Sequence, residues 1–176
     1  MSDISDNMFK FFEKYKGDCN VFFETGTHLG DTIQRAVALG YDKVISVELN
    51  FDRYNHCCNR FKNEIDQGKV ILFGGETTKR FDEMMSLLSA EDRCFFWLDA
   101  HDEGGGAPAR EELAIIKKYN RKCDRILVDD MNLYYQDNID QMRDSLKEIN
   151  GAYEISFDNF NNLPGVESIL IAMEKC

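Results

Sequence analysis

The sequence predicts an α/β fold in which a mostly parallel, seven-stranded sheet lies between two layers of helices and ends in an antiparallel β-hairpin. Three observations support this. Short apolar segments rich in β-branched residues alternate five times with segments of helical periodicity. The fourth such segment, 93–99, is apolar at every interior position, as a strand buried on both faces should be. The chain closes with two strand-like segments that have no helical pattern between them.

The same patterns place each element. An amphipathic helix over residues 4–16 comes first, and its aromatic side chains predict packing on the edge of the sheet, with a lid over the site as the alternative. The five parallel strands are expected at 21–23, 43–48, 69–73, 93–99 and 124–130. Helices are expected at 33–39, 51–65, 77–88, 109–119 and 136–149, and the closing hairpin at 153–157 and 168–173.

Composition and charge indicate the number of domains and argue against some classes of partner. The 176 residues suit a single domain over residues 1–176, with the N-terminal helix inside residues 1–18. The net charge of −11 argues against nucleic acid and against an anionic membrane surface as partners. The chain shows neither a signal peptide nor an apolar run long enough to span a bilayer, and its six cysteines are scattered, so we expect a cytoplasmic protein with free thiols.

The first strand leads into a glycine-spaced turn and the start of a helix, over residues 21–32. Gly26 and Gly30 permit backbone torsions and close approaches that a β-carbon would block. The free N–H groups at the start of a helix can hold an anionic or polar ligand. This unit therefore predicts a nucleotide-type binding site, in a crevice that the carboxyl ends of the strands line.

Acidic residues end four of the five predicted parallel strands, at Glu24, Glu48, Asp99 and the pair Asp129-Asp130. Because strands four and five end side by side in such a sheet, three of these carboxylates should lie close together. They would repel one another unless a cation or hydrogen-bond donors offset their charge, and a hard cation such as Mg²⁺ suits oxygen ligands. The alternative is that Asp129 and Asp130 bind backbone N–H groups of the following turn.

Two features close to Asp99 leave alternatives open. His101 could take a proton from a substrate hydroxyl, because the ordinary pKa of histidine is near neutrality, or it could be a structural loop residue. The glycine-rich loop at 102–108 could gate a substrate or simply connect two elements.

Five strand–helix units with a closing hairpin resemble the Rossmann-like, three-layer fold of class I S-adenosylmethionine-dependent methyltransferases. The pattern Glu24-x-Gly26-x-x-x-Gly30 is similar to the acidic first motif of that family. It differs from the G-x-G-x-x-G of dinucleotide enzymes, because Gly26 has no second glycine two residues away. In the family, this turn holds the methionine part of the cofactor, and Glu24 would orient the loop or the methionine ammonium.

Later strand ends continue the resemblance. Glu48 matches the acid that accepts the ribose hydroxyls, and Gly75-Glu76-Thr77 resembles a Gly-Asp-Ser segment whose acid approaches the adenine amino group. The resemblance thus implies S-adenosylmethionine as cofactor. The contacts it implies are Glu24, Gly26, Thr27, His28, Gly30, Asp31, Thr32, Glu48, Leu49, Gly75, Glu76, Thr77 and Asp99. Of these, His28 could be only a turn residue, and Asp31 and Thr32 could be ordinary helix caps.

The segments 24–32, 97–101 and 128–130 together resemble a subgroup of sugar- and macrolide-sugar O-methyltransferases, and the resemblance covers nearly the whole chain from about residue 20. It implies a metal such as Mg²⁺ on Asp99, Asp129 and Asp130, which in such enzymes holds two vicinal substrate oxygens. Catechol-type members have Asp-Asn where this chain has Asp129-Asp130, so the macrolide-sugar pattern fits better.

The predicted function is methyl transfer from S-adenosylmethionine to a hydroxyl of a small, sugar-like acceptor, with Asp99 and His101 as catalytic residues. One alternative is a binding or scaffold module without turnover. A nicotinamide oxidoreductase is disfavoured by the missing glycine motif and by the final hairpin. The chain shows no added substrate domain, so the acceptor pocket must come from short loops, the N-terminal helix or a partner subunit, which leaves a homodimer open.

Overall fold

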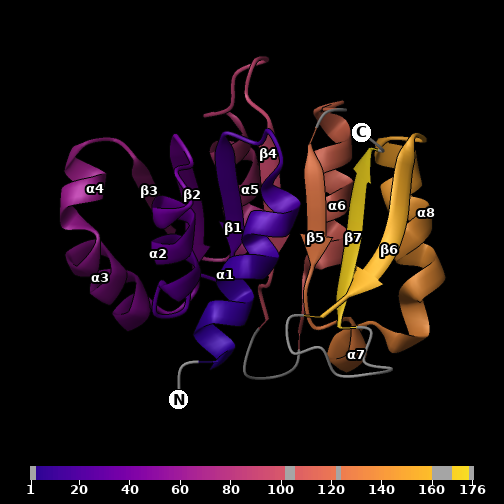
Figure 1. The fold of residues 1–176 in the computed structure, drawn as a ribbon, viewed down its shortest axis with the longest axis horizontal. Coiled ribbons are helices and arrows are strands. Elements are labelled where there is room, and N and C mark those ends of the chain that lie inside the picture. Colours follow the sequence, from indigo (N-terminus) through magenta and orange to yellow (C-terminus); the bar gives the residue numbers. More distant parts are fainter. Residues whose placement is uncertain (1–2, 102–105, 122–123, 160–167, 175–176) are drawn as a thin grey trace.

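A seven-stranded sheet forms the centre of the molecule, with strand order β3-β2-β1-β4-β5-β7-β6 (Figure 1). The structure is a computed structural model that describes residues 3–101, 106–121, 124–159 and 168–174. The strands are β1 (Val21–Thr25), β2 (Lys43–Glu48), β3 (Val70–Gly74), β4 (Cys94–Leu98), β5 (Arg125–Val128), β6 (Tyr153–Asp158) and β7 (Ile169–Glu174). Strands β1 to β5 are parallel, and β7 is antiparallel to both β5 and β6. The predicted fold class and the closing hairpin are confirmed.

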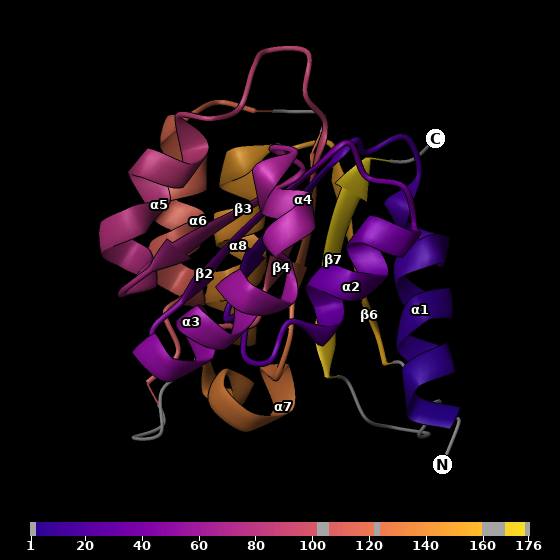
Figure 2. The ribbon, with the colours of Figure 1, turned by 90° about the vertical axis from the view of Figure 1, so that its left-hand side faces the viewer.

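Helices cover both faces of the sheet, as the burial of the strands on both faces requires (Figure 2). Side chains of α1, α2 and α3 form one core with one face, and those of α5, α6 and α8 form another with the opposite face. The helices are α1 (Asp3–Lys16), α2 (Asp31–Ala38), α3 (Phe51–Arg60), α4 (Lys62–Asp66), α5 (Thr77–Met85), α6 (Ala109–Lys118), α7 (Met131–Tyr134) and α8 (Ile139–Ile149), with a 3₁₀ turn at Gln136–Asn138. None of the described helices has the length and the apolar run that crossing a bilayer requires.

Helix α1 packs over the middle of the sheet, so the prediction that it packs on the sheet edge is wrong. The ring centroid of Phe12 lies 5.5 Å from that of Phe22 on β1 and 5.0 Å from that of Trp97 on β4. At the far end of α1, the Tyr15 hydroxyl donates to Asp158 Oδ2 of β6 at 2.5 Å. Residues 4–16 contain enough aromatic area to cover two central strands, and a periodic pattern alone does not say which strands a helix will cover.

Two helical segments differ from the prediction. The helix expected at 51–65 is two helices, separated at Phe61, whose side chain is buried at 5% exposure. The helix expected at 136–149 begins as a 3₁₀ turn, and α7 before it was not predicted. Strand and helix ends otherwise agree to within a few residues, which is the usual uncertainty at frayed ends.

Some predicted features lie outside the described residues. These are residues 102–105 of the glycine-rich loop, residues 160–167 between the two strands of the hairpin, and two of the six cysteines, Cys123 and Cys176. The other four cysteines are free thiols, three of them buried, as expected.

Candidate functional site

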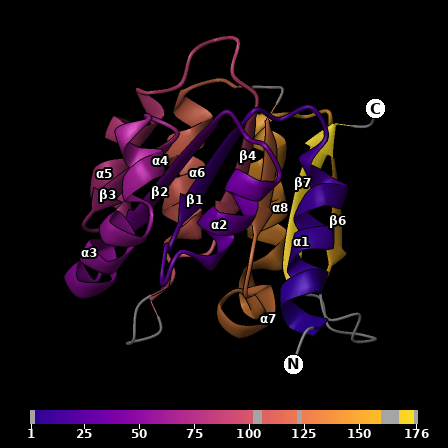
Figure 3. The same ribbon diagram turned by 60° about the vertical axis from the view of Figure 1, so that its left-hand side comes forward.

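A cavity of about 1060 Å³ opens at the carboxyl ends of the parallel strands. The N-terminal end of α1 and the short helix α7 lie at this same edge of the sheet (Figures 1 and 3). Ligand pockets commonly measure about 300–1,000 Å³, so this one has room for a nucleotide-sized ligand and a small second molecule. Ten predicted cofactor residues line it: Gly26, Thr27, His28, Asp31, Thr32, Glu48, Leu49, Glu76, Thr77 and Asp99. Glu24, Gly30 and Gly75 are not among the lining residues.

Glu24 lies beneath the glycine turn and is 0% exposed. Its Oε2 accepts a hydrogen bond from Ser46 Oγ at 2.6 Å, and its Oε1 accepts one from the Thr32 hydroxyl. The hydroxyls of Ser46 and Thr27 also share a hydrogen bond of 2.6 Å. Burial raises the pKa of Glu24 to about 8, although these two donors pull it down. Through these contacts, Glu24 connects the start of α2 to β2 and so supports the glycine turn.

The two glycines of the turn are required by packing. Gly26 and Gly30 have φ angles of 86° and 83°, which side chains rarely adopt. A β-carbon at Gly26 would lie 2.6 Å from the carbonyl oxygen of Asp99, and one at Gly30 would lie 2.5 Å from a ring carbon of Phe61. Gly26 therefore brings the turn directly against the end of β4, where Asp99 begins the next loop.

Glu48 joins the glycine turn to the start of α3. Its Oε2 accepts from the backbone N–H of His28 at 2.7 Å, and its Oε1 accepts from the backbone N–H of Asn50 at 2.8 Å. The side chain is buried at 5% exposure, yet it lines the cavity. Each carboxylate oxygen has two lone pairs, so each can still accept a hydrogen bond from a ligand. The two carboxylate oxygens of Glu48 are thus held in fixed positions in the cavity wall, where both can accept hydrogen bonds.

Leu49 and Glu76 are exposed residues of the cavity lining, and Thr77 beside them is buried. The Leu49 side chain is 58% exposed, which offers an apolar surface at the mouth. Glu76 pairs with Lys79 and accepts from the Thr78 hydroxyl at 3.0 Å, and the pairing with Lys79 lowers the pKa of Glu76. Glu76 therefore faces solvent as a charged group, whereas Glu48 is held inside.

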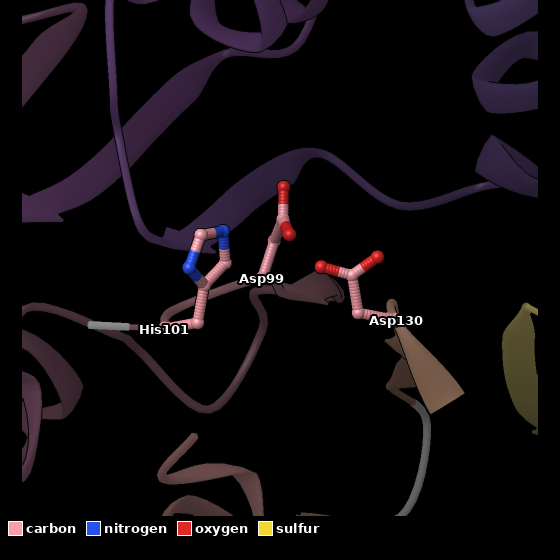
Figure 4. Close-up of side chains that lie close together, drawn as sticks. All are labelled: Asp99, His101 and Asp130. Atoms are coloured by element: carbon pink, nitrogen blue, oxygen red, sulfur yellow. The ribbon is translucent and has the colours of Figure 1, made fainter. Parts of the chain in front are cut away.

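Three predicted site residues come together at the ends of β4 and β5 (Figure 4). Asp99, His101 and Asp130 each offer a ligand atom within 4.8 Å of the others. Burial, followed by the charges of Asp129 and Asp130, raises the pKa of Asp99 well above its usual range. Among the described residues, the side chain of Trp97 donates a compensating hydrogen bond to the Asp99 carboxylate, from Nε1 at 3.3 Å. The charges of Asp129 and Asp130 thus act on Asp99 across the ends of the neighbouring strands β4 and β5.

Asp129, in contrast, is absent from that cluster of described residues. Its Oδ1 accepts from the backbone N–H of Asp130 at 2.8 Å, which is the local turn contact of the alternative interpretation. Asp130 itself adopts a left-handed conformation with φ of 55°. On the other side of the cluster, His101 stacks on Tyr134 of α7 with ring centroids 5.5 Å apart.

A second, smaller hollow of about 10 Å³ lies beside the cluster. Its walls include Asp99, His101, Asp130 and Tyr134. That volume is close to the minimum for one water molecule or one ion.

Several cavity residues were not predicted. Met8 contributes from α1, Arg35 from α2, Arg53 from α3 and Glu111 from α6. Helical spacing could have identified Arg35, because it lies one turn after Asp31 and Thr32 and so shares their face. Nothing in the sequence pattern could have placed Met8, because that depends on where α1 crosses the sheet.

No family model matches the chain, and no curated protein matches it in sequence. Solved structures match its fold. An O-methyltransferase from Bacillus cereus in complex with SAH has a TM-score of 0.65 at 17% identity, and the match covers 99% of this chain and 82% of that one. The SAH-bound Podospora anserina methyltransferase PaMTH1 has a TM-score of 0.63 at 13% identity, covering 98% and 78%. A putative caffeoyl-CoA O-methyltransferase from Staphylococcus aureus has a TM-score of 0.64 at 13% identity, covering 97% and 82%.

These likenesses define the fold. The chain has the Rossmann-like α/β fold of class I S-adenosylmethionine-dependent methyltransferases, with the seven-stranded, mostly parallel sheet and antiparallel final strands that the sequence predicted.

Proposed function

We propose that this protein is an S-adenosylmethionine-dependent methyltransferase that acts on a hydroxyl group of a small, sugar-like acceptor. The observation that carries the proposal is Glu48, a buried carboxylate fixed by two backbone N–H groups that still faces a cavity of about 1060 Å³. It stands at the strand end where a methyltransferase fold binds the cofactor ribose.

The residues around Glu48 fit the rest of the cofactor. The glycine turn at 26–32 and the start of α2 would hold the methionine part, and Leu49, Glu76 and Thr77 would border the adenine. Acidic side chains are frequent among the described lining residues, at Asp31, Glu48, Glu76, Asp99 and Glu111, which suits a ligand with a positive sulfonium. When bound, S-adenosylmethionine supplies an already activated methyl group, so the protein has to align the acceptor and remove a proton.

Proton removal falls to the residues at the end of β4. His101 is exposed at the cavity, and its stacking on Tyr134 fixes the plane of the imidazole. One of its ring nitrogens would accept the proton of the acceptor hydroxyl. Asp99, beside it, would accept a second hydrogen bond from the acceptor or share the proton.

The same cluster also fits a divalent cation, which is an alternative to the base role of His101. An imidazole that binds a cation through one nitrogen holds a proton on the other and accepts no further proton. Two carboxylate oxygens and one imidazole nitrogen within 4.8 Å form a mixed oxygen and nitrogen donor set. Mg²⁺ prefers oxygen ligands, and the nitrogen of His101 makes Mn²⁺ a second candidate. A bound cation would offset the repulsion between Asp99 and Asp130 and would lower the pKa of a coordinated acceptor hydroxyl.

Cofactor binding is tested by calorimetric titration of the purified protein with S-adenosylmethionine and with its demethylated product, S-adenosylhomocysteine. We expect both to bind with a dissociation constant in the micromolar range or below, on the order of −8 kcal/mol. NADH serves as the comparison ligand. Binding of NADH with no binding of either methionine-derived ligand would overturn the proposal, and binding without methylation of any hydroxylated acceptor would favour the scaffold alternative.

The metal proposal makes a separate prediction. At pH about 8, millimolar Mn²⁺ or Mg²⁺ is expected to raise the thermal midpoint of the protein, because a ligand that binds only the folded state stabilises it by about 2.7 kcal/mol at a hundredfold excess over its dissociation constant. Asp130→Asn should reduce this rise, since it replaces a charged ligand oxygen by a neutral amide oxygen. Asp144→Asn, an exposed acid on α8, is the matched control. An equal rise in both variants would show that the cations bind elsewhere.

A further inference from the structure

Glu112 is a fully buried acid on the inner face of α6. Its side chain is 0% exposed, and the same face of the helix carries the buried Leu113 and Ile116. Burying a carboxyl group costs free energy unless hydrogen bonds offset the cost, and an apolar side chain is the ordinary occupant of such a position. An acid here therefore calls for a role other than filling the core.

Glu112 is linked to Asp99 through one hydroxyl group. Thr25 Oγ1, at the end of β1, donates to Glu112 Oε2 at 3.3 Å and accepts from the backbone N–H of Asp99 at 3.3 Å. The same N–H donates to the Thr25 carbonyl oxygen at 3.2 Å. Because the Thr25 proton is committed to Glu112, a lone pair of that hydroxyl faces the Asp99 N–H.

The same carboxyl group also fastens a wall of the cavity. The neighbouring residue Glu111 lines the cavity, as do Ala107 and Pro108 immediately before α6. Glu112 bonds this end of α6 to the end of β1 through Thr25. Its other oxygen, Oε1, has no hydrogen-bond partner among the described residues, so the link to Thr25 is the one polar contact that its buried carboxyl oxygens make there.

The protonation of Glu112 suits this role. Burial raises the pKa of Glu112 to about 8, so the carboxyl group is mostly neutral at pH 7. A neutral carboxyl group still accepts the hydrogen bond from Thr25. It adds little negative charge near Asp99, where acids already repel one another.

We propose that Glu112 is a positioning residue that, through the Thr25 hydroxyl, fixes the backbone of Asp99 and holds the start of α6 against the end of β1. This inference rests on the proposed methyltransferase function, because it assigns Glu112 a part in placing the Asp99 of that site.

Two variants break the link, and two serve as comparisons. Glu112→Met removes the acceptor and keeps a long unbranched side chain, and Thr25→Val removes the hydroxyl and keeps the β-branched shape. Glu112→Gln retains an acceptor oxygen for Thr25. Ile116→Val alters a buried side chain on the same helix face without touching the link. The readouts are hydrogen exchange at the Asp99 amide of the ligand-free protein and the affinity for S-adenosylmethionine.

In Glu112→Met and in Thr25→Val, we expect the Asp99 amide to exchange about 3- to 10-fold faster and the affinity to fall by a similar factor, as for the loss of one hydrogen bond. The double variant should be no worse than either single one, because both break the same link. Glu112→Gln should stay within about twofold of the wild type.

The inference is overturned if Glu112→Met changes Asp99 exchange and cofactor affinity no more than Ile116→Val does. If Glu112→Met does not fold, Thr25→Val compared with Glu112→Gln gives the same decision. Failure of the wild-type protein to bind S-adenosylmethionine would overturn the proposed function instead, and exchange at Asp99 would still test the positioning role.

Discussion

Replacing Glu48 by alanine is expected to weaken S-adenosylmethionine binding by at least about 100-fold, because two hydrogen bonds to a charged acceptor contribute roughly 1.5–3 kcal/mol each. The two ribose hydroxyls are donors on adjacent carbons, and the Glu48 carboxylate offers one free lone pair on each oxygen. The variant also leaves the backbone N–H groups of His28 and Asn50 without their acceptor. The glycine turn and the start of α3 would then lose the group that joins them. Calorimetric titration measures the change.

Two comparisons separate the binding of the cofactor ribose by Glu48 from its contacts with the glycine turn and the start of α3. Glu48→Gln keeps one acceptor oxygen but loses the charge, so its affinity should lie between those of wild type and Glu48→Ala. Glu76→Gln changes an exposed acid of the cavity lining that is already paired with Lys79, and we expect a loss of less than about tenfold there. If folded Glu48→Ala binds the cofactor within about threefold of wild type, Glu48 does not hold the ribose.

The parallel sheet could be predicted because its central strands are buried on both faces. Cys94–Leu98 is apolar throughout and could hardly be anything other than a central strand. Once the strand ends were placed, Glu48 and Asp99 fell at one edge of a parallel sheet, and the cavity lies there. This part of the site follows from topology, which local patterns determine well.

The remaining features depend on contacts that no local pattern contains. Met8 lines the cavity only because α1 crosses β1 and β4, with Phe12 as its anchor. The division of one expected helix at Phe61 reflects where that ring is buried, beside Gly30. Glu112 did leave a signal, since helical spacing puts it on the same face as Leu113 and Ile116, where an acid is out of place.

Raising the pH from about 5 to about 8.5 is expected to lower the free energy of unfolding of the ligand-free protein by several kcal/mol, because buried acids, Glu24 and Glu112 among them, hold their protons in the folded state. Burial raises the pKa of Glu24 and of Glu112 from 4.5 to about 8. Between these values the unfolded chain has released both protons and the folded chain has kept them, so the unfolded state is favoured as the pH rises. One unit of pKa corresponds to about 1.4 kcal/mol, so the two groups can account for a change of this size.

Carboxylates whose pKa is lowered in the folded protein limit its stability at low pH. Arg60 lowers the pKa of Asp31, so the stabilisation from that pair is present above the unfolded pKa and is lost as the pH falls towards about 3. We therefore expect maximal stability near pH 5. Denaturant unfolding at pH 5, 6, 7 and 8 measures the profile at a fixed ionic strength of about 0.15 M.

Glu24→Gln isolates one of these two contributions. Glutamine has similar shape and can still bond the hydroxyls of Ser46 and Thr32, but it has no proton to release. Its stability should therefore fall less steeply between about pH 5 and 8 than that of wild type, with the two proteins differing most at the alkaline end. Glu13→Gln, an exposed acid on α1, should leave the slope unchanged. A flat or rising profile in the wild type would mean that Glu24 and Glu112 are ionised in the folded protein, and the glycine turn would then lie over a buried charge stabilised by the hydroxyls of Ser46 and Thr32.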